Sequence, residues 1–352
     1  MLPLRPSPVY PPKPRPGDRV AVLSPSSDLA ARLPLPYELG LARLEKEFGL
    51  RPVTYPSTLR KGASPQERAD DLHAAFADPE IRAVFTTIGG DDQLTVLPHL
   101  DRAVFRADPK PFFGYSDGTA LLAYLRNTGI VGFHGASVMC ELGRPGALHP
   151  LTAESLRAAL FTSGPYDLRP AAHYTDEDGD WAAPDTFASE PAMWQGNGWS
   201  WHGPERVVEG SSWGGNLEVL SWMLMADREM GAATDFDDGG VLFLETSEEL
   251  PRADDVYYVL RSMGERGLLG RFGALLMARP KAWSLSQRHS AEAKASYVRE
   301  QRAAVLRALT AYAPEMVAVF DVDFGHTDPQ LVIPCGGTIR VDGQARRITV
   351  TY

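Results

Sequence analysis

From residue 20 to residue 134 the chain alternates short apolar runs with longer segments of helical period, and this alternation limits the fold more than any other feature. The runs 20–23 and 130–133 are rich in Val, Ile and Leu and are too short for helices, so we expect them to be strands. Apolar residues at helical spacing lie between them, over 35–48 and 118–127. Strands that alternate with helices are typical of an α/β domain with a doubly wound, mostly parallel sheet.

The alternation breaks off in the middle of the chain. Residues 163–205 are rich in Gly, Pro, Asp and Trp and show no sustained period, which is typical of a linker or a functional insertion. A length of 352 residues also favours two domains, at about 150 residues each. We therefore predict an N-terminal α/β domain over 1–165, a connecting region over 166–205 and a C-terminal domain over 206–352. The C-terminal domain should be mixed α/β and β-rich, because its predicted helices are followed by several β segments at the end of the chain.

The composition excludes several classes of partner. The 45 acidic residues outnumber the 35 basic ones and give a net charge of -10, which disfavours binding to the phosphates of nucleic acids. The two cysteines lie far apart and no His-Glu-x-x-His pattern occurs, so we expect no metal and no cofactor. No apolar run approaches the roughly 18 residues of a membrane span, and the N-terminus has no apolar signal segment. We therefore expect a cytoplasmic protein without a membrane partner.

The loops after the predicted strands are the places to look for a site, because ligands of open α/β sheets bind beyond the carboxyl ends of the strands. One of these loops, 114–118, reads Gly-Tyr-Ser-Asp-Gly and lies between a predicted strand and a predicted helix. This is the G-x-S-x-G pattern of a nucleophile elbow, whose glycines allow a sharp turn that exposes the serine hydroxyl. Ser116 is therefore a candidate nucleophile. The alternative is that Ser116 or Asp117 only caps the following helix.

A serine nucleophile needs a base, and the base needs an acid to orient it. Glu245 is a candidate acid because it directly follows the buried strand expected over 241–244. Of the eight histidines, His134 and His326 are the two that follow predicted strands, and either could be the base. The order Ser116, Glu245, His326 is the order of nucleophile, acid and base in α/β-hydrolases.

An acyl-transfer site also needs backbone N–H groups that bind the oxyanion of the tetrahedral intermediate. Gly89 and Gly90 follow a predicted strand and offer such a group without a side chain in the way. Gly90 could form an oxyanion hole together with the amide of Asp117. The alternative is that the two glycines form a plain turn.

Six motifs that include these residues follow one another along the chain. They are Pro-Gly-Asp-Arg-Val-Ala-Val-Leu-Ser-Pro-Ser-Ser at 16–27, Ile-Gly-Gly at 88–90, Gly-Tyr-Ser-Asp-Gly-Thr at 114–119, Trp-Gly-Gly-Asn-Leu at 213–217, Leu-Glu-Thr-Ser-Glu at 244–248 and Phe-Gly-His-Thr-Asp-Pro at 324–329. By these motifs the chain resembles the LD-carboxypeptidase family of serine peptidases, which includes the microcin C self-immunity peptidases. The resemblance runs from about residue 14 to the C-terminus.

The resemblance implies a triad in which Ser116 is the nucleophile, Glu245 the acid and His326 the base. It also implies that the amides of Gly90 and Asp117 form the oxyanion hole. In the family the nucleophile lies on a flavodoxin-like N-terminal domain, while the acid and the base come from the C-terminal domain. We therefore expect the site at the interface between the domains, and, as is common in the family, a homodimer.

The connecting region points to one branch of the family. Microcin-type members carry an insertion before the Gly-Gly-Asn-Leu motif, and this chain has extra residues there that include Trp181, Trp194, Trp199 and Trp201. We expect Trp194, Trp199 and Trp201 to bind substrate, because an indole stacks well on a nucleobase; the alternative is a hydrophobic lid. Asn216 is a further candidate substrate-binding residue, with the alternative that it caps the next helix.

The expected reaction is hydrolysis of an amide bond through an acyl-enzyme. The microcin-type branch favours aspartyl or glutamyl amides of a nucleotide as substrates, and hence a role in self-immunity. The alternative is an LD-carboxypeptidase of murein recycling that removes terminal D-alanine from muropeptides. Under either interpretation the partner is a small molecule or peptide with a free carboxylate or a nucleotide group. An alternative of another class is a non-catalytic protein that binds a small ligand. Because a histidine base must be neutral, catalysis would give an activity that rises through about pH 6–7.

Overall fold

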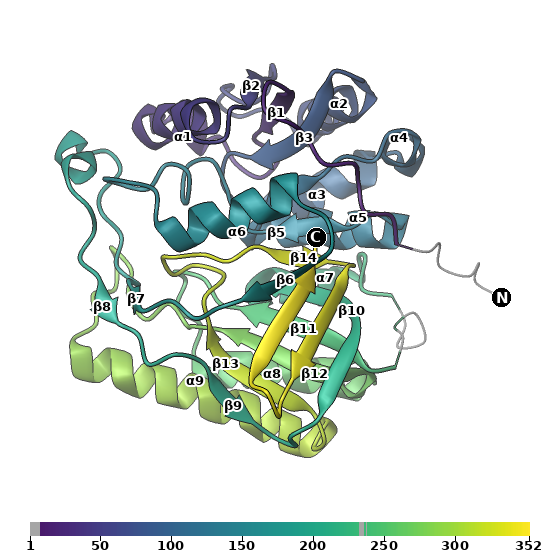
Figure 1. The fold of residues 1–352 in the computed structure, drawn as a ribbon, viewed down its shortest axis with the longest axis vertical. Helices are drawn as coiled ribbons and strands as arrows, with labels where there is room; N and C mark the ends of the chain where they lie inside the picture. Colours follow the sequence, from purple (N-terminus) through teal and green to yellow (C-terminus); the bar gives the residue numbers. More distant parts are fainter. Residues whose placement is uncertain (1–7, 232–235, 237) are drawn as a thin grey trace.

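The computed structural model describes residues 8–231, 236 and 238–352, so the first seven residues of the predicted N-terminal domain lie outside the described part. Two sheets with their helices lie one above the other, the N-terminal one in purple to blue and the C-terminal one in green to yellow (Figure 1). The protein is therefore an α/β protein of two domains, as the sequence predicts. The exact limits of the domains and of the connecting region stay a prediction.

The N-terminal sheet has six strands in the order β14-β5-β4-β3-β1-β2. The first five strands of the chain pair in parallel, and their order 2-1-3-4-5 is that of flavodoxin-like sheets. These strands are β1 (Arg19–Leu23), β2 (Arg51–Thr54), β3 (Ile81–Thr86), β4 (Phe112–Gly114) and β5 (Gly132–His134). The predicted flavodoxin-like N-terminal domain is thus confirmed.

Helices separate these strands along the chain. They are α1 (Pro34–Lys46), α2 (Pro65–Ala77), α3 (Gln93–Val96), α4 (Arg102–Ala107), α5 (Thr119–Thr128) and α6 (Pro150–Phe161). The start of α2 follows from its capping box, because the Ser64 hydroxyl accepts the Glu67 N–H and the Glu67 carboxylate accepts the Ser64 N–H. The end of α5 follows from Gly129, whose φ of 90° lies in the left-handed region that favours glycine. The sequence did not predict α3 and α4, because helices of four and six residues are too short to show a hydrophobic period.

The C-terminal sheet has eight strands in the order β6-β16-β15-β10-β11-β12-β13-β9. Its central strands β10 (Val207–Asn216), β11 (Gly240–Glu245), β12 (Phe272–Ala278) and β13 (Val317–Val322) are parallel. The hairpin β15 (Thr338–Asp342) and β16 (Arg347–Thr351) adds antiparallel strands next to β10. With the helices α7 (Leu217–Ala226), α8 (Ala253–Glu265) and α9 (Ala291–Tyr312), this sheet confirms the mixed α/β, β-rich C-terminal domain.

The connecting region contains more regular structure than its sequence indicates. The strand β6 (Pro165–Leu168) pairs with β16 at one edge of the C-terminal sheet, and β9 (Ser200–His202) pairs with β13 at the other. Between them β7 (His173–Tyr174) and β8 (Trp194–Gln195) form a separate ladder. These strands have two to four residues and are largely exposed, so they lack the alternation of apolar and polar residues by which a longer strand is recognised.

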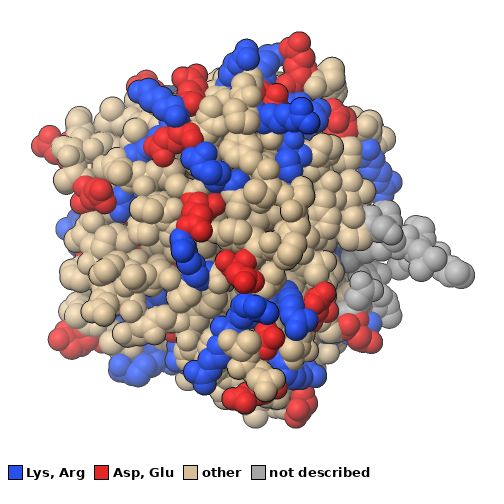
Figure 2. All heavy atoms as spheres, viewed as in Figure 1, with Lys and Arg blue, Asp and Glu red and all other residues tan. Residues whose placement is uncertain are grey.

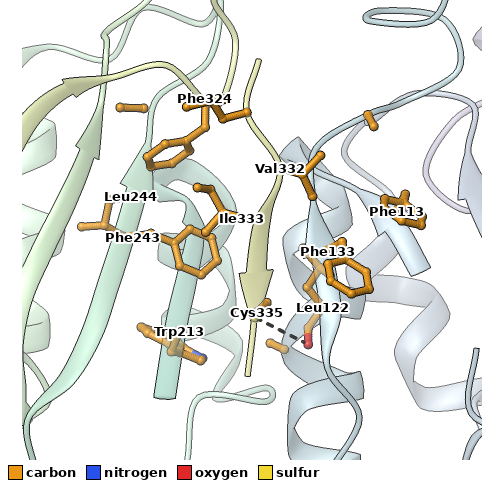
Figure 3. Packing of buried hydrophobic residues seen from close by; sticks show 14 of the residues in the cluster. Phe113, Leu122, Phe133, Trp213, Phe243, Leu244, Phe324, Val332, Ile333 and Cys335 are labelled. Atoms are coloured by element: carbon orange, nitrogen blue, oxygen red, sulfur yellow. Dashed lines mark hydrogen bonds between the residues drawn. The ribbon is translucent and has the colours of Figure 1, made fainter. Parts of the chain in front are cut away.

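A strand from the C-terminal half of the chain closes the N-terminal sheet and joins the two cores. The strand β14 (Ile333–Cys335) pairs antiparallel with β5, so that Ile333 lies opposite His134. Figure 3 shows Ile333 beside Phe243 of β11 on one side and Phe133 of β5 on the other side of β14. Because buried side chains pack continuously across β14, the carboxyl ends of β4 and β11 are held in a fixed relation to each other.

The surface carries both signs of charge. On the face shown in Figure 2, Lys and Arg side chains alternate with Asp and Glu side chains and form no large field of one sign. Within residues 8–231, 236 and 238–352, no helix is both long enough and apolar enough to cross a membrane.

Candidate active site

Ser116 lies on a sharp turn directly after β4 and before α5. Its φ of 58° is left-handed, a strained conformation for a residue with a side chain and one that occurs often at functional sites. Gly114 lets β4 approach β3, because a Cβ there would lie 2.7 Å from Thr86 Oγ1. The N-cap of α5 is Gly118 and no side chain caps this end, so the alternative that Ser116 or Asp117 serves as its cap does not hold. The turn therefore presents the Ser116 side chain, as the nucleophile-elbow pattern predicts.

The two glycines after β3 lie against this turn. A Cβ on Gly89 would lie 2.7 Å from Ser116 Cβ and 2.8 Å from Ser116 Oγ. A Cβ on Gly90, whose φ is 156°, would lie 2.6 Å from the carbonyl oxygen of Ser26. Only glycine, which has no side chain, allows the loop 89–90 to approach Ser116 and Ser26 this closely. The backbone of 89–90 thus forms one wall of the space around the Ser116 hydroxyl.

Asp117 holds the loop after β3 through its side chain. The carboxylate is fully buried and accepts the backbone N–H of Gln93 at 2.8 Å. Burial raises the pKa of Asp117 to about 6, with the hydrogen bond from Gln93 acting in the opposite direction. This contact fixes the turn of Ser116 relative to the loop that carries Gly89 and Gly90.

The structure brings Glu245 and His326 together. Glu245 is the last residue of β11 and is 1% exposed, and its Oε2 lies 2.6 Å from His326 Nδ1. Gly325, with a φ of 84°, allows this approach, because a Cβ there would lie 2.7 Å from Glu245 Cβ. Burial by itself would lower the pKa of His326, but the Glu245 carboxylate, and after it Glu248, outweigh this effect and raise the pKa to about 9. Burial by itself would raise the pKa of Glu245, but the positive charge of His326 outweighs the effect of burial and lowers this pKa.

His134, the second candidate base, occupies a different position. It is fully buried at the end of β5, and its Nε2 lies 3.7 Å from Glu245 Oε1, on the other side of the carboxylate from His326. Within the described residues, both ring nitrogens of His134 and Glu245 Oε1 lack a hydrogen-bond partner. His326 borders the open cleft and His134 does not, so His326 is the histidine that a substrate could reach.

A cleft of about 1140 Å³ opens between the domains and contains the candidate residues of both. Ser116, Gly89 and Gly90 line it from the N-terminal domain, and Asn216 and His326 from the C-terminal domain. A cavity of this size holds a nucleoside derivative or a short peptide. Among the described residues, Ser116 and His326 form no hydrogen bond in this conformation. Catalytic hydrogen bonds are often open in unliganded enzymes and close on substrate binding.

Asn216 caps a helix and also lies at the cleft. Its Oδ1 accepts the Val219 N–H at 2.9 Å and caps α7, so the N-cap alternative is observed. Its backbone N–H donates to Thr119 Oγ1 at 2.9 Å, and Gly215 beside it leaves no room for a Cβ against Thr119. Its Nδ2 is buried and has no partner among the described residues, and Asn216 is one of the residues that line the cleft. The side-chain amide of Asn216 thus keeps an unused donor next to the cleft.

The tryptophans of the connecting region are placed differently from the prediction. Trp199 donates its indole N–H to the buried Asp323 carboxylate at 2.8 Å, Trp201 lies opposite Val319 in the pairing of β9 with β13, and Trp194 is 47% exposed on β8. None of the three lines the cleft, so their positions do not support the expected substrate contact. The cleft is lined instead by Trp181 of the same region and by Trp222 of α7.

The charges of the cleft were not foreseen from the sequence. Among the described residues, nine acidic side chains line it, against two basic ones, Arg144 and Lys281, besides His326. Arg144 pairs with Asp328 at 2.7 Å, and Lys281 pairs with Asp178 at 2.7 Å. Within the described part of the chain, no three His, Cys, Asp or Glu side chains are placed to hold a metal ion. Three of the nine acids, Glu177, Asp178 and Asp180, come from the acidic run 176–180, and the others come from distant segments.

Comparisons with known proteins agree with this geometry. The sequence profile of the LD-carboxypeptidase N-terminal domain matches residues 20–135, and that of the LD-carboxypeptidase C-terminal domain matches residues 209–341. Together these ranges cover more than half of the chain. The chain belongs to the LD-carboxypeptidase family. It is therefore a member of a family of serine peptidases.

Individual relatives span nearly the same length. A protein of Vibrio cholerae that is provisionally named a carboxypeptidase is 28% identical in sequence. The match covers 94% of this chain and 95% of the Vibrio protein. The microcin C7 self-immunity protein MccF of Escherichia coli is 25% identical, over 81% and 78% of the two chains. A solved structure of MccF in complex with aspartyl sulfamoyl adenosine has the same fold, with a TM-score of 0.83 at 23% identity over 98% of this chain and 99% of that one.

Proposed function

We propose that this LD-carboxypeptidase family member is a serine carboxypeptidase with the triad Ser116, His326 and Glu245. The observation that carries the proposal is the 2.6 Å contact between His326 and Glu245 at the cleft that Ser116 also lines from a strained turn. A buried carboxylate on Nδ1 sets the tautomer of the imidazole and leaves Nε2 to exchange protons. Gly90 and Asp117 are the proposed oxyanion donors, because Asp117 follows Ser116 in the chain and Gly90 follows Gly89, which lies against Ser116.

In the proposed reaction His326 Nε2 takes the proton of the Ser116 hydroxyl as Oγ attacks the substrate carbonyl. The backbone N–H groups stabilise the oxyanion, and His326 then gives its proton to the leaving amine, so that the amide bond breaks and an acyl-enzyme remains. A water molecule loses a proton to His326 and attacks the ester. Ser116 regains that proton, and the acyl group leaves as a carboxylic acid. Glu245 stays ionised and stabilises the imidazolium.

For the substrate, an aminoacyl amide of a nucleotide is the first candidate, and detoxification of such a compound is the role that would follow. Trp181 and Trp222 line the cleft and offer flat faces on which a nucleobase could stack. The related MccF is named for self-immunity to microcin C7, and its structure holds aspartyl sulfamoyl adenosine. A homodimer and a cytoplasmic location stay predictions for this chain.

A muropeptide is the second candidate, and the charge of the cleft favours it. With nine acidic against two basic side chains, the cleft repels an aspartyl or glutamyl side chain and attracts an amine. Peptides whose acyl residue carries a free amine fit this field better than acidic aminoacyl groups. Cleavage would then release a terminal D-amino acid.

The experiment compares two substrates with one enzyme. The initial rates of hydrolysis of aspartyl sulfamoyl adenosine and of an L,D-linked tetrapeptide ending in D-alanine are measured by chromatography. The Ser116→Ala variant serves as the blank, with kcat reduced by about 10⁴-fold or more. A higher kcat/KM for the nucleotide supports the first candidate, and the reverse supports the second. Equal rates for the wild type and Ser116→Ala would refute the serine mechanism and favour a protein that only binds its ligand.

A further inference from the structure

Glu248 lies at the nitrogen of His326 that the reaction needs. Its Oε2 is 3.4 Å from His326 Nε2, whereas Glu245 occupies Nδ1. We infer that Glu248 is a specificity-determining residue that binds an ammonium group in the acyl part of the substrate, and that it occupies His326 Nε2 when no substrate is bound. This inference rests on the proposed function, because it assigns the substrate class of the same site.

The position of Glu248 allows it to change partners. The loop after β11 is fixed just before it, because Glu218 Oε1 accepts both the backbone N–H and the hydroxyl of Ser247, at 2.8 and 2.7 Å. The Glu248 side chain itself is 54% exposed and lines the cleft, so it can turn from His326 toward a ligand without moving the backbone. A half-exposed ion pair of this kind is weak, so a ligand charge can displace it.

The pair with Glu248 conflicts with the catalytic role of His326. A base must be neutral and must face the Ser116 hydroxyl, but a carboxylate at Nε2 favours the imidazolium and occupies the direction of approach. Among the described residues, other charged or titratable groups also lie near His326. Glu245 contacts its Nδ1, and Lys281 Nζ donates to its carbonyl at 3.2 Å. The Tyr115 ring packs against the imidazole, and the Tyr115 hydroxyl donates to Glu141. Lys281 is the one cation among them, and it is neutralised by Asp178.

An ammonium group on the substrate would remove this conflict. In an aminoacyl amide the α-ammonium is attached to the carbon next to the reacting carbonyl, so it stands within a few ångströms of Ser116 and of His326 Nε2. Pairing with Glu248 would draw the carboxylate away from Nε2 and cancel part of its charge. The free base would then form on substrates that carry the amine. A substrate whose amine is acetylated would leave Glu248 on His326.

The test uses Glu248→Gln and, as a matched control, Glu205→Gln, which removes the same charge at an exposed position outside the cleft. The first measurement is the NMR titration of the His326 imidazole in the unliganded protein. The Glu248→Gln variant should lower the pKa of His326 by about 0.5–1 unit, since a partly exposed carboxylate within 4 Å has about this effect, and Glu205→Gln should change it much less.

The second measurement compares kcat/KM for aspartyl sulfamoyl adenosine with its α-amine free and with that amine acetylated, because the reacting residue of the L,D-linked tetrapeptide has its α-nitrogen in a peptide bond. At about pH 7, where an α-ammonium is mostly charged, the wild type and Glu205→Gln should prefer the free amine by about 5-fold or more, and Glu248→Gln should lose most of this preference. A structural role of Glu248 would reduce both rates equally.

The outcomes separate the two proposals. An unchanged His326 titration in Glu248→Gln, or a preference for the free amine that Glu248→Gln retains, overturns the role of Glu248 while the serine mechanism stands. Hydrolysis of the tetrapeptide alone overturns the role of Glu248 in substrate recognition, because no ammonium group then stands next to the reacting carbonyl. Absence of hydrolysis of both forms of aspartyl sulfamoyl adenosine and of the tetrapeptide by the wild type overturns the proposed function, and with it the role of Glu248.

Discussion

The short distance between Gly89 and Ser116 gives a sharp prediction for Gly89→Ala. Gly89 has no left-handed φ, so alanine fits its backbone and the effect of the substitution is purely steric. The new methyl group would lie 2.7 Å from Ser116 Cβ, whereas carbon atoms in contact prefer about 3.5–4.0 Å, so the two segments must separate by about 1 Å. The loop of Gly89 and the turn of Ser116 together frame the reacting carbonyl.

A displacement of about 1 Å at a reacting group costs on the order of 10²-fold in rate. We therefore expect kcat of Gly89→Ala to fall about 100-fold, with a loss of about 1–3 kcal/mol in the free energy of unfolding from overpacking. The assay is steady-state hydrolysis of the better of the two substrates, together with thermal unfolding to show that the variant is folded.

Gly118→Ala is the matched control on the other side of Ser116. A Cβ at Gly118 would meet no atom within 4 Å, and its φ of -55° suits alanine. We expect kcat within about 2-fold of the wild type. The G-x-S-x-G pattern alone would give weight to Gly118, which belongs to it, and none to Gly89, which does not. Equal losses in Gly118→Ala and Gly89→Ala, or wild-type kcat in a folded Gly89→Ala, would refute this reasoning.

Three further predictions follow from the same site. First, kcat/KM should rise with pH through an apparent pKa above 7 rather than at 6–7, because only neutral His326 acts as base. Burial lowers the pKa of His326, but Glu245 outweighs this effect and raises the pKa to about 9. A plateau of kcat/KM already at pH 6 would contradict this prediction. Second, Glu245→Gln should lower kcat by about 10⁴-fold in a single-substrate assay, because the amide no longer stabilises the imidazolium; a loss below about 10-fold would exclude an essential acid. Third, Trp181→Ala should raise KM for a nucleotide substrate about 10-fold, as lost base stacking does, whereas Trp194→Ala outside the cleft should leave it unchanged; equal KM values in the two variants would place the nucleobase elsewhere.

The N-terminal fold and the loops that carry the candidate catalytic residues could be predicted from the sequence because local signals determine them. The capping box at Ser64 and the strand–turn–helix context of Ser116 are short-range features, and the structure has both. Glu245 and His326 were found because each follows a buried strand, and parallel strands bring such positions to one edge of a sheet.

The remaining parts of the site depend on contacts between distant segments. Trp181 reaches the cleft and Trp199 does not, because the buried Asp323 from the C-terminal domain binds the Trp199 indole, a contact across 124 residues. No local signal separates the two tryptophans, and the sequence-based prediction names Trp199 and not Trp181. Glu248 had a local signal, since it ends the motif Leu-Glu-Thr-Ser-Glu, but its contact with His326 appears only when 245–248 and 324–329 are brought together.

The central claim is that Ser116 is an activated nucleophile. The most direct measurement is labelling of the folded protein with a fluorophosphonate, followed by mass spectrometry of the intact chain and of its peptides. The account predicts one adduct, on Ser116, that is absent in Ser116→Ala and forms far more slowly in His326→Ala. No adduct on a folded sample, or an adduct on another serine that persists in Ser116→Ala, would contradict it.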